Sequence, residues 1–315
     1  MKMKNLAAIG LLLAAQPALA QEMRSYVDDT GTTVQVPVDP QRIVVLADQI
    51  IGTSLIELGA NVAAGTARVN DDGSFYYRGM GEQFGITPEI LPVASIQEQF
   101  DFEKIKSFNP DLIIGLPFAI DFLDQLNAIA PTVIHTNQGA DSPLVQYGKL
   151  ADLVNRTAKY EELQAIYEAR LVEVKAALFP EGGTTYVALR PDPDNGMIET
   201  YRHYGAVTQV PDDLGLTYAK VIDTLPEGTY AGDFSAEAIQ DFNMDYVLTT
   251  YRPHTGGTPE NIYEEMAMVV PGYDSFMTSA INKHIISLPA EYVVPHTFAS
   301  MHNVLDAFEA NAAAD

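Results

Sequence analysis

Two fourteen-residue stretches of this chain repeat one pattern. Residues 101–114 read DFEKIKSFNPDLII and residues 235–248 read SAEAIQDFNMDYVL, with Glu, Ile, Phe, Asn and Asp identical at a constant offset. Each stretch opens on a residue type that caps helices, continues with apolar residues at helical spacing, and ends in an apolar run. The sequence therefore predicts a helix followed by a buried strand, built twice in one chain.

Strands and helices alternate at short spacing around both copies, which predicts parallel sheets covered by helices. A turn signal, DDTG, predicts a hairpin within residues 22–40. Helices are expected at 52–60, 120–130, 204–216, 261–269 and 298–312. Strands are expected at 42–47, 60–65, 111–116, 132–136, 184–190, 245–251 and 284–289.

One long helix separates the two halves. From residue 157 to about 178, apolar residues recur at helical period, at Leu163, Ile166, Tyr167, Leu171, Val174 and Leu178. We therefore expect an α/β fold with two lobes, at 21–156 and 179–315, joined by a linker helix at 157–178.

The first 20 residues have the pattern of a secretory signal. MKMKN is basic, LAAIGLLLAA is a short apolar run, and ALA before Gln21 is a small-x-small cleavage site. A buried N-terminal helix is the competing interpretation. We expect cleavage after Ala20 and a periplasmic protein. Cysteine is absent, so the acceptor of a bacterial lipid anchor is missing.

Beyond the signal, 16 basic residues face 42 acidic ones. This strongly negative balance argues against nucleic acid as a partner. It also makes local groups of arginine informative. We expect a monomer with no cofactor.

The chain resembles the periplasmic substrate-binding proteins of ABC importers for iron–siderophores, haem and cobalamin, the class whose lobes are joined by one helix. The stretches that carry the resemblance are VQVPVDPQRIVVL, LIELGANVAAG, FDFEKIKSFNPDLIIG, LNAIAPTV, FSAEAIQDFNMDYVLTTY and INKHIISLP. Together they span most of the mature chain, and the ferric-siderophore branch is the most similar. The resemblance implies a ligand cleft between the two lobes, capture of a ferric siderophore in that cleft, and its delivery to an importer permease.

The repeated unit places one Glu near the start of each helix, at Glu103 and Glu237. A carboxylate there is favoured by the helix dipole alone, by about 0.3–1 kcal/mol. The resemblance implies a second role, because an acidic residue at this place in each lobe of similar proteins docks onto arginines of the permease. Both interpretations can hold together.

Arginine and tyrosine cluster where strands are expected to end, which is where α/β sheets bind ligands. Arginine offers a planar fork of donors to anionic oxygens, and tyrosine adds flat apolar area with a hydroxyl. Packing between lobes and pairing with acidic residues are the alternatives. The candidates from this pattern are Arg68, Tyr77, Arg78, Arg190, Tyr201, Arg202, Tyr251 and Arg252.

The resemblance adds Tyr230 and Tyr292, at positions that match iron-coordinating residues of binders for tetradentate catecholates. Tyr230 stands where those proteins have His, and Gly115 to Phe118 follow a strand after which some relatives have Arg. If the first lobe needs an arginine, Arg68 or Arg78 must supply it. These departures favour a ligand that already saturates its iron(III), such as a hexadentate hydroxamate or mixed siderophore, without a metal held by the protein.

Haem or cobalamin binding and a periplasmic enzyme are the alternative functions. Haem or cobalamin is an alternative ligand for the same protein class. A periplasmic enzyme is disfavoured, because G-x-S-x-G, H-E-x-x-H and phosphate-binding glycine motifs are absent from the sequence. The six histidines also form no HxH or HxxxH spacing, which disfavours a binder of bare zinc or manganese.

Overall fold

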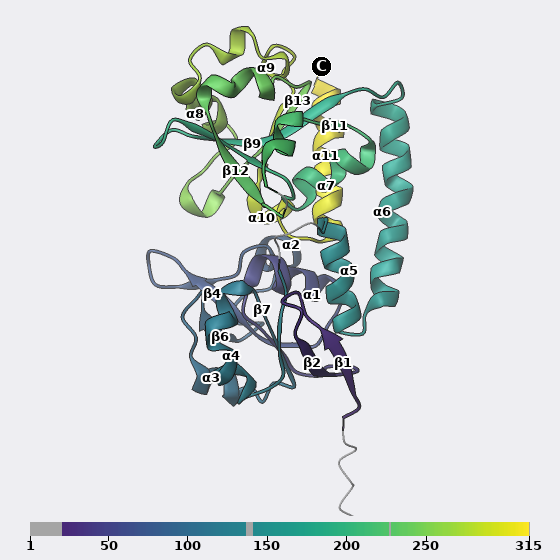
Figure 1. The fold of residues 1–315 in the computed structure, drawn as a ribbon, viewed down its shortest axis with the longest axis vertical. Coiled ribbons are helices and arrows are strands. Elements are labelled where there is room, and N and C mark those ends of the chain that lie inside the picture. Colours follow the sequence, from purple (N-terminus) through teal and green to yellow (C-terminus); the bar gives the residue numbers. More distant parts are fainter. Residues whose placement is uncertain (1–20, 137–140, 227, 315) are drawn as a thin grey trace, which may run out of the picture.

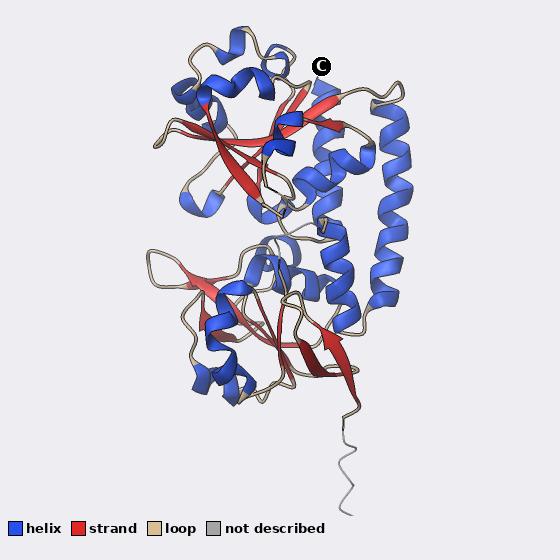
Figure 2. Cartoon of the chain, in the orientation of Figure 1, coloured by secondary structure: helices blue, strands red, loops and turns tan. Residues whose placement is uncertain are grey.

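The computed structural model of this chain describes residues 21–136, 141–226 and 228–314. Two α/β lobes lie one above the other in Figure 1, the lower formed mostly by earlier residues and the upper mostly by later ones. Each lobe has its own sheet with helices packed around it, as Figure 2 shows. The predicted fold class is confirmed. The signal expected at residues 1–20 lies outside the described residues.

The first lobe is built on six strands, in the order β5-β4-β3-β7-β8 with β6 paired to β4. Every pair is parallel except β4 with β5. The predicted hairpin is present as the antiparallel pair β1 and β2. The strands are β1 Met23–Val27, β2 Thr33–Pro37, β3 Ile43–Val45, β4 Val62–Val69, β5 Phe75–Tyr76, β6 Val93–Ile96, β7 Leu112–Gly115 and β8 Thr132–Ile134.

The second lobe also has six strands, in the order β12-β10-β9-β13-β14 with β11 paired to β9. Strands β9, β11, β13 and β14 are parallel, whereas β10 and β12 extend the sheet as antiparallel strands that the sequence patterns did not predict. The strands are β9 Thr185–Asp192, β10 Met197–Tyr201, β11 Thr217–Tyr218, β12 Ala231–Ser235, β13 Tyr246–Tyr251 and β14 Ile285–Pro289.

The repeated sequence unit forms a helix and then a strand in both lobes. The first copy gives helix α3 (Phe102–Ser107) and β7, and the second gives the 3-10 helix η4 (Ala236–Phe242) and β13. Strands β7 and β13 occupy the same place in their sheets, next to the last strand and parallel to both neighbours. Asp101 caps α3 through the N–H of Lys104, and Ser235 caps η4 through the N–H of Glu237.

The long helix expected at 157–178 is α6 (Thr157–Leu178), which runs alongside both lobes in Figure 1. Its apolar stripe is only partly covered. Tyr167 and Val174 are buried, whereas Ile166 is 54% exposed. The helix packs against α5, α7 and α11.

The remaining helices cover the sheets and the junction between the lobes, and no described helix is long and apolar enough to cross a bilayer. They are η1 Asp48–Gly52, α1 Thr53–Glu57, α2 Met80–Phe84, η2 Pro117–Phe122, α4 Leu123–Asn127, α5 Pro143–Leu153, α7 Ala206–Leu214, η3 Lys220–Thr224, η5 Pro253–Thr255, α8 Asn261–Val269, η6 Tyr273–Ser275, α9 Thr278–Ile281, α10 Ala290–Val293 and α11 Phe298–Ala314.

The carboxylate of Glu57, at the end of α1, connects helices at the junction between the two lobes by hydrogen bonds. Its oxygens accept the backbone N–H groups of Phe298 (2.9 Å) and Ala299 (2.7 Å), the first two residues of α11. It also accepts the hydroxyl of Tyr147 from α5 at 2.6 Å. The ring of Tyr147 packs on Phe298 and on Tyr160 of α6. Glu57 therefore caps a helix of the opposite half of the chain.

Replacing Glu57 with alanine is expected to destabilise the fold. Glu57→Ala leaves two helix N–H groups and the Tyr147 hydroxyl without their acceptor, which should cost roughly 2–3 kcal/mol in the free energy of unfolding. Urea denaturation measures this against Glu161→Ala, which removes an exposed carboxylate from α6. Equal midpoints for the two variants would show that the junction does not depend on this cap.

Candidate functional site

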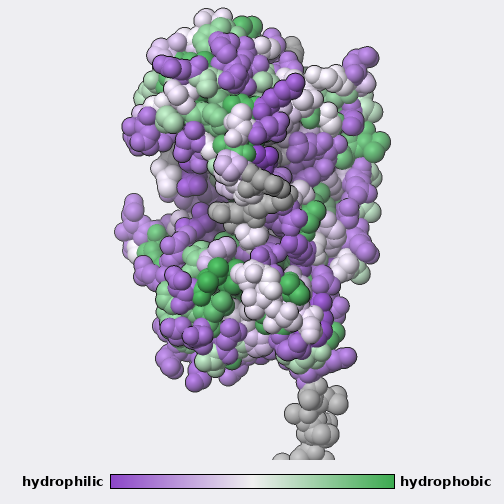
Figure 3. Space-filling model, viewed as in Figure 1, coloured by the Kyte–Doolittle hydropathy of each residue, from purple (hydrophilic) through white to green (hydrophobic). Residues whose placement is uncertain are grey.

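A cavity of about 170 Å³, hereafter the interlobe cavity, lies between the two sheets. Residues that follow β3, β6 and β7 of the first lobe and β13 of the second line it. Parallel strands converge their carboxyl ends at one edge of a sheet, which explains why side chains distant in sequence meet there. Figure 3 shows a notch between the lobes, edged largely by hydrophilic residues.

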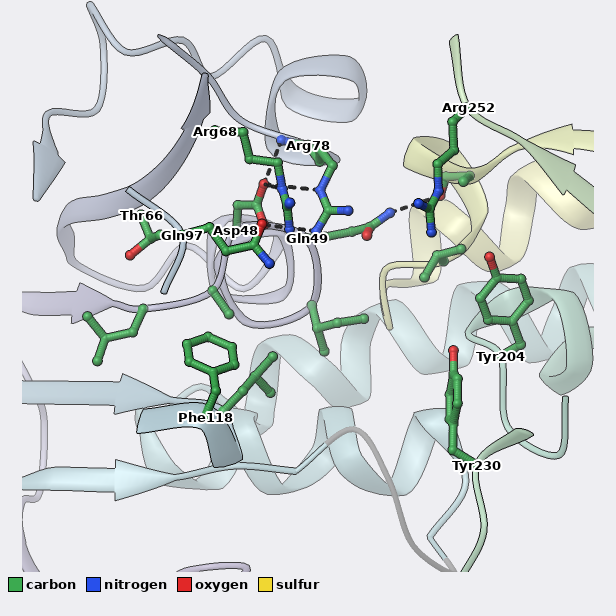
Figure 4. Close-up of a pocket in the computed structure, with 16 residues that line it drawn as sticks. Asp48, Gln49, Thr66, Arg68, Arg78, Gln97, Phe118, Tyr204, Tyr230 and Arg252 are labelled. Atoms are coloured by element: carbon green, nitrogen blue, oxygen red, sulfur yellow. Dashed lines mark hydrogen bonds and ion pairs between the residues drawn. The ribbon is translucent and has the colours of Figure 1, made fainter. Parts of the chain in front are cut away.

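Asp48 holds two arginines on the first-lobe wall. It is 3% exposed and directly follows the buried run of β3. Its carboxylate accepts hydrogen bonds from Arg68 Nε at 3.2 Å and from Arg78 Nε and Nη2 at 3.3 Å. Burial would raise the pKa of Asp48, but the charges of Arg78 and Arg68 hold that pKa below its usual range. The carboxylate of Asp48 thus holds the side chains of both Arg68 and Arg78, as Figure 4 shows.

Arg252 and two tyrosines form the facing wall. Arg252 follows β13, and across the described residues its guanidinium has no hydrogen bond or ion pair. Tyr204 stacks on Tyr201 with ring centres 4.1 Å apart, and the Tyr230 ring meets both edge-on. Tyr204 is fixed by a 3.0 Å hydrogen bond to Thr250. Figure 4 places this wall opposite the arginine pair.

Four sequence-predicted residues line the interlobe cavity, namely Arg68, Arg78, Tyr230 and Arg252. Arg190 and Tyr251 lie in an adjoining cavity that shares Arg252. Tyr201 stands behind Tyr204 and does not line the interlobe cavity.

Three predicted residues lie elsewhere. Tyr77 is buried in the core of the first lobe, where its hydroxyl donates to the carbonyls of Leu91 and Pro92. Arg202 donates to backbone carbonyls of η3 and the residue after it, so it packs the second lobe. Tyr292 is 37% exposed and lies outside both cavities. Each follows a strand end in sequence, yet local packing turns its side chain away.

Several residues of the site were missed by sequence reasoning. Asp48, Gln49, Gln97 and Phe118 all lie within a few residues of a strand end and line the interlobe cavity. Their positions near strand ends could have identified them. They were not predicted because only arginine and tyrosine were selected at such positions. Asp48 matters most, because it sets how much positive charge the arginine pair presents.

The interlobe cavity is smaller than the roughly 300–1,000 Å³ typical of pockets for drug-sized ligands. The lobes also touch beside it, since His254 Nε2 lies 2.5 Å from Glu82 Oε1 and the His254 ring packs on Tyr76. A ligand larger than the interlobe cavity therefore requires the two lobes to separate at this contact.

The two glutamates of the repeated unit are exposed. Glu103 lies in the first turn of α3 and Glu237 in the first turn of η4. Neither has a side-chain hydrogen bond or ion pair within the described part of the chain. Both carboxylates are thus available at the surface of their lobes.

A cavity enclosed by strand ends of two separate α/β lobes defines a two-lobe binding protein, which surrounds a small molecule from both sides. The chain belongs to the periplasmic binding protein family, whose model matches residues 52–292. The resemblance drawn from the sequence is thereby confirmed.

Individual relatives agree with this assignment. The chain is 26% identical over 241 residues to the iron(3+)-hydroxamate-binding protein FhuD of Bacillus subtilis (strain 168), covering 75% of this chain and 71% of that protein. The FhuD protein of S. pseudintermedius has the same fold, with a TM-score of 0.68 at 18% identity over 91% of this chain and 98% of that one. Staphylococcus aureus SirA, solved with staphyloferrin B, has a TM-score of 0.70 at 15% identity over 92% and 98%.

The ion pairs of Asp48 with Arg68 and Arg78 predict that the stability of the fold depends on pH. Because the pKa of Asp48 is depressed in the folded state, its stabilising effect is present above about pH 4, the usual range for Asp, and is lost as the pH falls further. Asp48→Asn should therefore lower the free energy of unfolding at pH 7 by about 2–3 kcal/mol, with a smaller difference from wild type at pH 3.

Urea denaturation at both pH values measures this difference, with the exposed Asp121→Asn as the matched control. A deficit of Asp48→Asn that is the same at pH 7 and pH 3 would contradict the assigned ion pairs.

Proposed function

We propose that this protein captures a ferric siderophore between its lobes and delivers it to the permease of an ABC importer. The main support for this proposal is the distribution of arginine in the interlobe cavity. Arginines from both lobes, Arg68 and Arg78 on one wall and Arg252 on the other, line a single cavity in a chain of very few basic residues.

The charges of the cavity suit such a ligand. Three guanidinium groups face one buried carboxylate, Asp48, so the lining keeps a net positive charge. Ferric complexes of hydroxamate, catecholate and carboxylate chelators present clustered oxygens, to which guanidinium groups donate. Tyr204, Tyr230 and Phe118 supply flat apolar surface for the organic frame of the chelator. The hydroxamate-binding relative supports the same ligand class.

Iron is held by its chelator in this proposal. Of the two tyrosines at positions matching iron ligands, Tyr230 lines the interlobe cavity and Tyr292 does not. A chelator that fills all six positions around iron(III) needs no protein ligand. The protein then acts as an exported, monomeric carrier without catalytic turnover, with lobes at 21–156 and 179–315 joined by the helix at 157–178.

Glu103 and Glu237 are the proposed contacts to the permease. Each is an exposed carboxylate in the first turn of a capped helix, and the two helices are the matching elements of the two lobes. A transporter with two similar halves would meet the same acidic feature twice. Arginine pockets on that partner would form charge-assisted hydrogen bonds with them.

A ligand panel tests the proposed capture. Tryptophan is absent and tyrosine is plentiful, so a coloured ferric siderophore in the cavity should quench tyrosine emission. We expect at least one hydroxamate, catecholate or carboxylate complex to bind with a Kd of about 1 μM or lower, and Arg252→Gln to weaken it. Haem, followed by its Soret band, and cobalamin complete the panel. Binding of haem or cobalamin alone would overturn the siderophore assignment.

Docking is tested separately by uptake of radiolabelled ferric siderophore in cells that lack the native gene. Glu103→Ala combined with Glu237→Ala should abolish uptake while leaving ligand affinity unchanged, because neither residue lines the interlobe cavity. The matched control combines Glu161→Ala with Glu181→Ala, two exposed glutamates outside the repeated unit. Normal uptake by the first double variant would show that the permease does not use this pair.

A further inference from the structure

A pair of side chains joins the two lobes beside the interlobe cavity. His254 lies in the short helix η5 of the second lobe, and Glu82 lies in α2 of the first. The distance from His254 Nε2 to Glu82 Oε1 is 2.5 Å, and the His254 ring packs on Tyr76 of β5 with ring centres 4.4 Å apart. The contact therefore connects η5 to two elements of the opposite lobe.

On the second-lobe side, the contact is coupled to Arg252. The carbonyl of Arg252 accepts hydrogen bonds from the N–H groups of Thr255 (3.1 Å) and Gly257 (2.9 Å) and from the hydroxyl of Thr255 (3.1 Å). A Cβ at Gly257 would lie 2.9 Å from the backbone nitrogen and oxygen of Arg252, so the turn is closed too tightly for a side chain there. Residues 252–257 form one compact turn, and His254 therefore moves together with Arg252.

On the first-lobe side, the contact is coupled to Arg78. The second carboxylate oxygen of Glu82 accepts the N–H of Gly79 at 2.7 Å, and Gly79 directly follows Arg78 in the chain. Gly79 has a φ of 78°, in the left-handed region that favours glycine, so the chain turns sharply between Arg78 and α2. Glu82 thus fixes this turn with one oxygen and reaches His254 with the other.

The contact between His254 and Glu82 thereby sets the separation of Arg78 and Arg252, which stand on opposite walls of the interlobe cavity. While it is made, the walls enclose only about 170 Å³. Other hydrogen bonds across the lobes, from Gln49 and Gln83, end on α10 and α11 at the junction. The contact of His254 with Glu82 is the one that leads within a few residues to an arginine of each wall.

We propose that His254 and Glu82 form a latch that holds the ligand-free cleft at this width, and that a ferric siderophore binds by releasing it. The identity of the ligand rests on the proposed function. Both are positioning residues, because neither lines the interlobe cavity. Their side chains are 29% and 18% exposed, and a partly exposed pair contributes modestly, so a ligand can break it. Since the latch exists only without ligand, removing it favours the ligand-bound state.

The width of the cleft can be measured without any ligand. The chain has no cysteine, so Lys106→Cys in α3 and Glu264→Cys in α8, both at exposed positions, carry one spin label in each lobe. Double electron–electron resonance gives the distribution of distances between the labels. His254→Phe keeps a ring beside Tyr76 but removes the bond to Glu82, and it should shift this distribution to longer distances.

The matched control makes the same substitution within one lobe. His284 also stacks on a tyrosine, Tyr246, with ring centres 4.3 Å apart, and both residues belong to the second lobe. His284→Phe should therefore leave the distances unchanged. His254→Ala removes the ring as well as the bond, and it should also lengthen the distances if His254→Phe does not fold.

Ligand affinity provides the second measurement. The ferric siderophore that the panel identifies should bind His254→Phe about threefold tighter than the wild type, because binding no longer breaks the latch. A merely structural defect would weaken binding instead. Unchanged distances, or unchanged or weaker binding, would overturn the latch and leave the proposed function standing. If no ferric siderophore binds, the proposed function is overturned, while the distances still decide whether the latch holds the cleft.

Discussion

The arrangement of the lobes depends on the carboxylate of Glu57. It accepts hydrogen bonds from two N–H groups at the start of α11 and from the hydroxyl of Tyr147 in α5. Helices α1, α5 and α11, which are far apart in the sequence, therefore meet at this carboxylate. Rings from α5, α6 and α11 close around it. Burial raises the pKa of Glu57 while the three donors oppose that shift, which is the signature of a carboxylate kept inside for its hydrogen bonds.

With the lobes fixed at this junction, the opposite edges of the sheets face one another and their strand ends form the interlobe cavity. The ligand that the cavity can bind then depends on how much arginine charge is not neutralised by ion pairs within the protein. Asp48 partly neutralises the charge of Arg68 and Arg78, whereas Arg252 has no ion pair among the described residues. The two walls therefore differ: the first carries a partly neutralised arginine pair, and the second carries Arg252 beside stacked tyrosines.

The fold could be predicted from the sequence because it rests on periodicity. The repeated unit, the alternating strands and the helix α6 are all local patterns, and each is present. Strand β10 follows β9 after a short turn, a local hairpin that the sequence patterns did not predict, whereas β12 pairs with β10 from farther along the chain. Strand ends pointed to Arg68, Arg78 and Arg252, and the resemblance to Tyr230, all of which line the interlobe cavity. The directions of the Tyr77 and Arg202 side chains could not be predicted, because they depend on packing.

We propose that iron enters the cleft inside its chelator, between arginines of the two lobes. Anomalous X-ray diffraction from crystals grown with a bound ferric siderophore locates the iron directly. The structure predicts one iron peak between the pair Arg68–Arg78 and Arg252, surrounded by chelator oxygens, with the contact between Glu82 and His254 opened. An iron peak outside the cleft, or one coordinated only by protein side chains, would contradict it.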